Sequence, residues 1–158
     1  MNSPANIIWQ FLLDEGLGMS THVAWRAYVG FFPTDPNEAI CVFDMPGRKD
    51  GRIMRTGEQI IHPGIQIQVR GMEYLRTFQK AKTIALRLDR VQKESVATES
   101  DVFYTLHNVS RTGDIMHMGV ETVGALRRHV FAINAVLTLN SDDDDNFLIT
   151  DGGDYLIT

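Results

Sequence analysis

The side chains of this 158-residue chain that could do chemistry are its histidines, its one cysteine and an acidic run near the C-terminus. No two histidines have the i, i+4 spacing of helical metal ligands, although neighbouring strands could bring His107 and His117 together. Cys41 lies in the apolar run Ala39–Phe43, which is typical of a small buried residue rather than a nucleophile. We expect ordinary surface or hydrogen-bonded histidines at His22, His62, His107, His117 and His129.

The acidic run Asp142–Asn146 begins like a calcium-binding loop. However, Phe147 stands where such a loop needs a turn glycine, and Gly153 stands where it needs a bidentate glutamate. Gly16 and Gly18 follow a helical pattern and lack a third glycine, so they do not form a dinucleotide-binding fingerprint. The sequence also lacks a P-loop and the nucleophile elbow of serine hydrolases. We therefore predict no catalytic residue, no metal and no cofactor, and a protein that is not an enzyme.

Four cations lie close together in the sequence at Arg48, Lys49, Arg52 and Arg55, offset by Asp50. The segment is rich in glycine and charge, and we expect an exposed loop that starts at Arg48. Its cations could simply be solvated, or they could contact an acidic partner surface or the phosphates of passing nucleic acid. No aromatic platform flanks them, so sequence-specific recognition of nucleic acid is not expected.

The net charge of −5 comes from the C-terminal end of the chain. Six of the 20 acidic residues follow Ser141, no basic residue follows Arg128, and the remainder carries 15 basic and 14 acidic side chains. This nearly neutral body has no basic stripe for duplex DNA. The hydrophobic share of 44%, the single cysteine and the lack of a long apolar run predict one reduced, cytoplasmic domain without disulfides, signal peptide or membrane span.

Two segments have helical patterns. Ser3 is a suitable N-cap, Pro4 suits the first helical position and Gly16 suits the left-handed residue after a helix, which predicts a first helix of about three turns. A longer helix is predicted over Met72–Val91, where apolar residues recur at helical spacing. Its expected apolar stripe and flanks are Tyr74, Leu75, Phe78, Ala81, Ile84, Ala85, Leu88 and Val91. Each helix therefore has one face to bury.

Six segments have strand patterns, and the clearest is Ile65–Val69, in which apolar and polar residues alternate. Pro63-Gly64 is expected to mark its start and Gly71 its end. Thr112–Asp114 has the composition of a tight hairpin turn between two strands. The other expected strands are a short one within Ala24–Phe32, Ala39–Phe43 ending at Asp44, Val102–Leu106, Ile115–Met118, and a long one over Arg128–Leu139 that could extend beyond the sheet edge.

The C-terminal segment contains an internal repeat. Phe147–Thr150 recurs as Tyr155–Thr158, and the Gly-Gly pair between them predicts a β-hairpin. An isolated two-stranded ribbon is marginal in water, so its side chains need a covering surface on the same body or on a neighbouring subunit. The preceding run Asp142–Asp145 is expected to be a solvated linker. We therefore divide the chain into a body, residues 1–140, and an arm, residues 141–158.

Three glycine-containing motifs follow one another along the body. Gly16-Leu17-Gly18 comes after an N-terminal helix, and an edge strand ends in a glycine-containing turn at Val42–Gly47. After a variable loop, Pro63–Gly71 runs directly into Met72-Glu73-Tyr74 and the long helix. With these motifs in this order, about residues 3–140 resemble the minor capsid and tail-terminator family of long-tailed bacteriophages.

The resemblance implies a fold and a function. The fold is α+β, with a mixed, mostly antiparallel sheet and two main helices packed on one face, to which the predicted C-terminal β-hairpin arm is added. Members form a ring, usually a hexamer, at the head-proximal end of the tail tube, where they stop tube growth and dock to the head. The chain would then be a virion protein of the tail or neck, made in the host cytoplasm and not associated with a membrane.

The implied partners are other copies of the chain, the major tail tube protein and the head connector or head-completion protein, with non-specific contact to DNA in the lumen. Gln66, Gln68 and Arg70 give a strand face that could be plain solvent-exposed sheet or a subunit contact. The arm could pair with an adjacent subunit or neck protein by strand addition. The candidate interface residues are Arg48, Lys49, Arg52, Arg55, Gln66, Gln68, Arg70, Phe147, Ile149, Tyr155 and Ile157.

Two alternative functions stay open at this point. The first is a head-completion or connector protein, which would form a neighbouring ring of the neck. The second is a small cytoplasmic ligand-binding or enzymatic α+β domain whose site is built from scattered residues.

Overall fold

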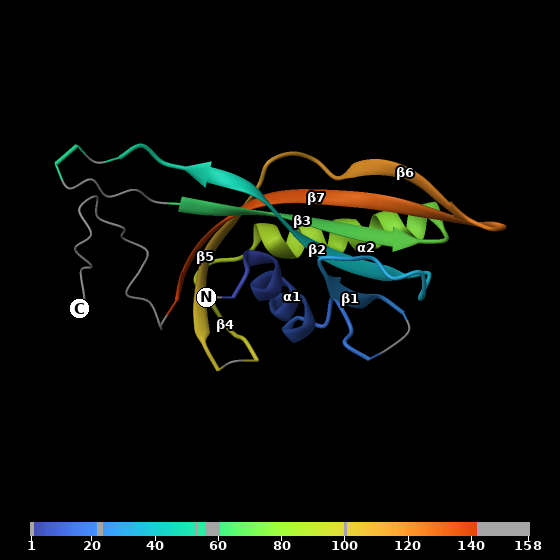
Figure 1. Cartoon of the computed structure of the whole chain (residues 1–158), viewed down its shortest axis with the longest axis horizontal. Coiled ribbons are helices and arrows are strands. Elements are labelled where there is room, and N and C mark those ends of the chain that lie inside the picture. The colour runs from blue at the N-terminus through green and yellow to red at the C-terminus, as the bar shows by residue number, and fades with distance from the viewer. Residues whose placement is uncertain (1, 22–23, 53, 56–60, 100, 142–158) are drawn as a thin grey trace.

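A computed structural model describes residues 2–21, 24–52, 54–55, 61–99 and 101–141 (Figure 1). The predicted hairpin of the arm lies outside these residues. The helices and strands are α1 (Pro4–Asp14), β1 (Arg26–Val29), β2 (Ala39–Lys49), β3 (Ile61–Gly71), α2 (Tyr74–Asp89), β4 (Glu94–Ala97), β5 (Phe103–Arg111), β6 (Met116–Val123) and β7 (Leu126–Ser141). None of the described helices is long and apolar enough to span a membrane.

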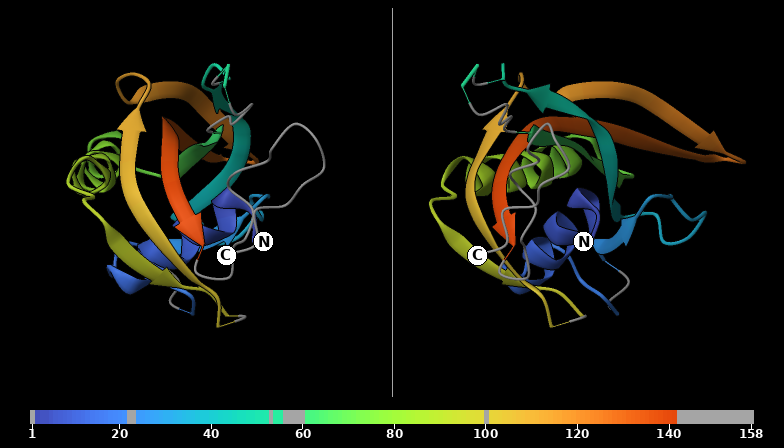
Figure 2. Two further views of the ribbon diagram at one scale, coloured as in Figure 1. Left: turned by 90° about the vertical axis from the view of Figure 1, so that its left-hand side faces the viewer. Right: turned by 60° about the vertical axis from the view of Figure 1, so that its left-hand side comes forward.

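The strands form one curled sheet in the order β1-β2-β3-β7-β5-β4, with β6 also paired to β7. β1 is parallel to β2, and the other described pairs are antiparallel. The register places Val42, Ile67 and Ile133 side by side on one face. Both helices pack on this face in a single core cluster, and Figure 2 shows the strands bending around them. The predicted α+β class and helix placement are confirmed.

The first helix is set by its end signals. The Ser3 hydroxyl accepts the backbone N–H of Asn6 at 3.2 Å, Pro4 opens the helix, and Gly16 adopts a φ of +69° after it. The helix buries the apolar face that the sequence predicts, which consists of Ala5, Ile7, Ile8, Phe11 and Leu12. Both of its boundaries are therefore fixed by local chemistry.

The second helix is confirmed, but its first turn is less buried than its apolar stripe suggests. Ala81, Ala85 and Leu88 are buried, whereas Tyr74 and Leu75 are 50% and 57% exposed. Thr77 is buried instead, and its hydroxyl donates to the Glu73 carbonyl at 2.6 Å. The first turn thus leaves apolar side chains at the surface.

Two expected strand ends are wrong. β2 does not stop at Asp44 but continues to Lys49, and β3 begins at Ile61, before Pro63-Gly64. The register shifts between Met45 and Arg48, so the Pro46-Gly47 step forms a β-bulge rather than a turn. A bulge absorbs the proline and glycine without ending the strand, which lengthens this part of the sheet.

The expected hairpin turn at Thr112–Asp114 is also wrong. β5 and β6 do not pair with each other, because both pair with β7, β5 toward its C-terminal end and β6 toward its N-terminal end. The hairpin is instead formed by β6 and β7, with Gly124 at φ +60° in the turn. β7 contains the predicted Arg128–Leu139 and is two residues longer at each end, and it extends beyond β3 to form the projecting end of the molecule (Figure 1).

Candidate interaction surface

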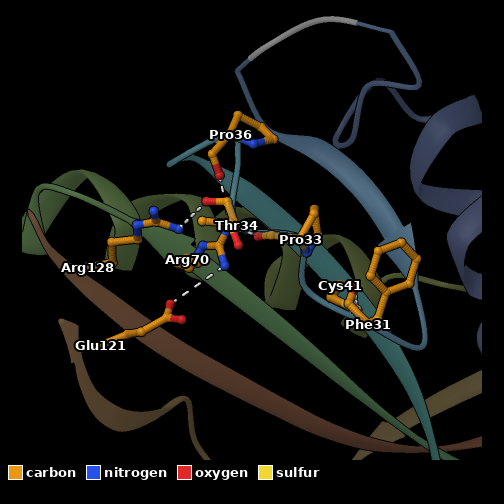
Figure 3. A network of polar contacts seen from close by, with 8 residues as sticks. All are labelled: Phe31, Pro33, Thr34, Pro36, Cys41, Arg70, Glu121 and Arg128. Atoms are coloured by element: carbon orange, nitrogen blue, oxygen red, sulfur yellow. Dashed lines mark hydrogen bonds and ion pairs between the residues drawn. The ribbon is translucent and has the colours of Figure 1, made fainter. Parts of the chain in front are cut away.

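Two buried arginines hold a loop against the sheet face opposite the helices (Figure 3). Arg70 on β3 and Arg128 on β7 are each 1% exposed. The Arg70 Nη2 group donates to the carbonyl oxygens of Pro33 and Pro36, both at 2.7 Å, and Arg128 Nη1 donates to the Thr34 carbonyl at 2.6 Å. We call this arrangement the arginine clamp. It fixes the segment between β1 and β2 across two other strands.

The clamp brings two cations close together in a dry environment. The carboxylate of Glu121, which is 45% exposed, lies 3.6 Å from Arg70 Nη1. Burial, and then the charge of Arg128, lower the pKa of Arg70 below its ordinary value. Within the described part of the chain, the Nε atoms of both arginines have no hydrogen-bond partner. Burying charged side chains costs free energy of folding. The best attested role of such buried charges is to specify one conformation over others.

The prediction that Arg70 shares an accessible polar face with Gln66 and Gln68 is wrong. The three residues do lie on one face, but the loop that crosses β3 covers Arg70. The two glutamines are half-buried and form a ladder, in which Gln68 donates to Gln66 at 2.7 Å and Gln66 donates to Asn134 at 2.9 Å. The glutamine ladder remains on the surface beside the clamp.

The four cations Arg48, Lys49, Arg52 and Arg55 are exposed at the far end of β2, and we call them the basic end. Arg48 and Lys49 belong to the strand, so the expected loop starts later than predicted. Because Lys49 pairs with Ile61 and His129 pairs with Gly71, the length of β3 separates the basic end from the β6–β7 hairpin.

Hydrogen bonds connect the basic end to the end of β7. His62 Nε2 lies 3.0 Å from Asp50 Oδ2, and His62 Nδ1 lies 3.0 Å from Thr138 Oγ1. Thr138 is close to Ser141, after which the sequence continues into the acidic run. His62 therefore links the basic end to β7 three residues before the arm begins.

The sequence did not reveal an exposed apolar set on the β6–β7 hairpin. The exposed side chains are Met116, Met118, Val120 and Leu126, which lie on both faces of the hairpin, and we call them together the hairpin patch. Tyr74 at the start of α2 contacts the same hairpin through His117 and His129. Exposed apolar patches on a soluble protein commonly mark sites of interaction. The sequence signal that could have revealed this set is a strand with apolar residues, because the chain provides no second apolar element to cover that strand.

A free strand edge adjoins the basic end. β1 pairs with Ala39–Val42 of β2 only, so in the described ranges the outer edge of Phe43–Lys49 has no partner strand. Unpaired edges offer N–H and C=O groups to another strand. The molecule thus presents different surfaces at its two ends: a basic end with an open edge, and an apolar hairpin.

The comparison with protein families found a match. A family model described as bacteriophage tail terminator protein matches residues 11–151. The chain belongs to the bacteriophage tail terminator family. The resemblance stated from the sequence is therefore confirmed. No curated protein matches the chain.

Membership makes this tail terminator a structural component of the virion tail. The described residues contain no group of three or more potential metal ligands. Of the predicted interface residues, the basic end and the glutamines are accessible, Arg70 is not, and Phe147, Ile149, Tyr155 and Ile157 lie outside the described residues. The structure places His117 next to His129, and not next to His107.

Cys41 of the tail terminator is buried, as predicted, and we expect it to be unreactive in the native protein. Its Sγ donates to the Phe31 carbonyl at 3.1 Å, and burial raises its pKa to about 11. At pH 8 the native thiol should carry roughly a hundredfold less thiolate than the unfolded one. Iodoacetamide labelling should therefore be slow in buffer and fast in denaturant. Equal labelling rates under the two conditions would contradict this burial.

Proposed function

We propose that copies of the chain close into a ring, most simply a hexamer, at the head-proximal end of the tail tube. The ring ends tube polymerisation and joins the tail to the head. The observation that carries this proposal is the tail terminator family match over residues 11–151. Under this proposal the protein belongs to the tail and neck of the virion, is made in the host cytoplasm and has no enzymatic activity.

The two ends of the molecule present different surfaces, and this difference supports a ring. The basic end and the hairpin patch lie at opposite ends of the sheet (Figure 1), so the two surfaces of a contact between copies need not be the same. Contacts of this heterologous type give a ring when the rotation closes and a filament when it does not. A closed ring on the end of a tube offers no site for the next tube subunit.

The arm supports a contact between subunits. Residues 141–158 are proposed to form a separate unit that adds a strand to a neighbouring subunit or neck protein. The open edge of β2 at Phe43–Lys49 is one receiving surface that the described residues offer. Its cations complement the aspartates at the start of the arm. Phe147, Ile149, Tyr155 and Ile157 would then be covered by the partner.

The remaining partners follow from the position of the ring. One face would contact the major tail tube protein, and the other would contact the head connector or head-completion protein. The exposed cations of the basic end could also contact DNA phosphates in the lumen without sequence preference. Glutamines 66 and 68 could contribute neutral hydrogen bonds to any of these contacts.

Two measurements on the full chain test the proposal. Native mass spectrometry or mass photometry, with and without purified tail tubes, should detect a closed multimer. Electron microscopy of particles made without the protein should show unjoined heads and tubes of uncontrolled length. A chain that stays monomeric in the presence of tubes, or particles of normal length and attachment, would overturn the proposal. Localisation of the chain in the neighbouring ring would identify a connector instead.

Charge reversal at the basic end should impair assembly but not folding. The variant Arg48→Glu with Lys49→Glu places repulsive charge beside the acidic partner surface, while both side chains are exposed in the isolated chain. Its melting temperature should change by only about 1–2 °C, whereas the yield of complete particles should fall strongly. The matched control is Lys82→Glu with Arg90→Glu, two exposed cations on and after α2. Equal particle yields from the two variants would leave the basic end a solvated surface.

A further inference from the structure

Two histidines meet on the β6–β7 hairpin. His117 lies opposite Phe131 and His129 lies opposite Val120, with a register shift between His117 and Gly119. Bulges of this kind re-aim side chains. The His117 Nε2 and His129 Nδ1 atoms are 3.4 Å apart, and the ring centroids are 5.5 Å apart. Two ring nitrogens from neighbouring strands therefore face the same point.

Aromatic neighbours hold both imidazoles in place. The Tyr74 ring stands edge-on to His117 and His129, with centroid distances of 5.4 and 5.3 Å. Phe131 packs against His117 at 4.9 Å. His117 is exposed and His129 is half-buried, so the nitrogens are both oriented and open to ions from solvent. Orientation before binding lowers the entropic cost of capturing an ion.

The separation of the two nitrogens favours a metal over a simple hydrogen bond. Hydrogen bonds donated by nitrogen are usually about 2.7–3.2 Å long, so 3.4 Å is a weak contact between the rings. Two imidazole nitrogens that each lie about 2.0–2.1 Å from a tetrahedral ion are separated by about 3.3–3.4 Å. The observed spacing therefore matches the bite of a metal chelate.

We propose that His117 Nε2 and His129 Nδ1 bind a divalent transition-metal ion of the class that prefers imidazole: Zn²⁺, Ni²⁺ or Cu²⁺. Since the described residues provide no third His, Cys, Asp or Glu at this point, water or a ligand from a second copy completes the coordination. The bound ion joins β6 to β7 beside the hairpin patch and stiffens the projecting end of the sheet. The site does not depend on the proposed ring.

The experiment uses the full chain, stripped of metal with EDTA, and titrates Zn²⁺, Ni²⁺ and Cu²⁺ separately. We expect saturable binding of one ion per chain and a rise in melting temperature that grows with metal concentration. Cu²⁺ should show an electron paramagnetic resonance spectrum with coupling to two imidazole nitrogens. Because protons compete for the same nitrogens, affinity should fall as the pH is lowered.

Two variants locate the site, and a third is the control. His117→Gln and His129→Gln should each weaken binding by about tenfold or more and remove one nitrogen coupling. His107→Gln changes a half-buried histidine on β5, outside the pair, and should bind like the parent. Because His117 is exposed, its variant keeps the test valid even if His129→Gln folds poorly. Absence of binding to the parent, or equal affinity of the three variants, would overturn the proposal.

Discussion

Replacing Gly47 by alanine is expected to lower the free energy of unfolding by about 3 kcal/mol. Gly47 lies in the β2 bulge, where a Cβ atom would overlap the carbonyl oxygen of His62 and lie 2.8 Å from the Gly64 nitrogen. Both atoms belong to the backbone of β3, so no side chain can rotate away. The two strands must separate, which breaks ladder hydrogen bonds beside the basic end.

The measurement is thermal or urea unfolding of the isolated chain, in which Gly47→Ala should melt about 10 °C below the parent. Gly51→Ala is a matched control four residues away, because a Cβ atom there meets nothing within 4 Å. That variant should unfold like the parent. If the two alanine variants were equally stable, β2 and β3 could not approach each other as closely as the structure shows.

Local chemistry made some elements predictable from the sequence. Ser3, Pro4 and Gly16 each act within a few residues, so the limits of α1 follow directly from their types. The apolar alternation of β3 and β7 likewise identifies the face that packs on the helices, because each strand alternates between the two sides of the sheet.

Pairing between distant strands was not predictable in the same way. Thr112–Asp114 has turn chemistry, but β5 and β6 both find their partner in β7, which no local signal indicates. β4 was missed because its four residues are too few for a periodic pattern. Proline and glycine at the β2 bulge indicated an end to the strand, although a bulge accommodates them equally well.

The interaction surface was predicted only in part. The exposure of the basic end follows from its composition. The burial of Arg70 depends on a loop from another part of the sequence, and alternation within β3 carries no information about that loop. The His117–His129 pair depends on the register of β6 against β7. The wrong prediction of a hairpin turn at Thr112–Asp114 concealed that register.

The arginine clamp leads to the second prediction of a large effect. Arg70→Met should lower the free energy of unfolding by about 3 kcal/mol, because it leaves the carbonyl oxygens of Pro33 and Pro36 without their donor. Methionine roughly preserves the aliphatic volume, so the loss is mainly one of hydrogen bonds. Relief of the repulsion between Arg70 and Arg128 offsets part of it, since the burial of two cations lowers the pKa of Arg70.

A conservative variant separates charge from geometry. Arg70→Lys keeps the positive charge, but an ammonium group lacks the planar fork of a guanidinium. It should therefore recover only part of the stability lost in Arg70→Met. Limited proteolysis should cut both variants faster than the parent between residues 31 and 37, because the loop is no longer held on the sheet.

Glu121→Gln distinguishes the clamp from its ion pair. Glu121 is half-exposed and lies 3.6 Å from Arg70, so removing its charge should cost less than about 1 kcal/mol. If Glu121→Gln destabilised the protein as much as Arg70→Met, the ion pair rather than the carbonyl contacts would hold the loop. If Arg70→Met unfolded like the parent and resisted protease equally, the clamp would contribute nothing. The expected order follows from burial: the Arg70 side chain is buried where it meets the carbonyl oxygens, whereas the Glu121 carboxylate retains much of its hydration.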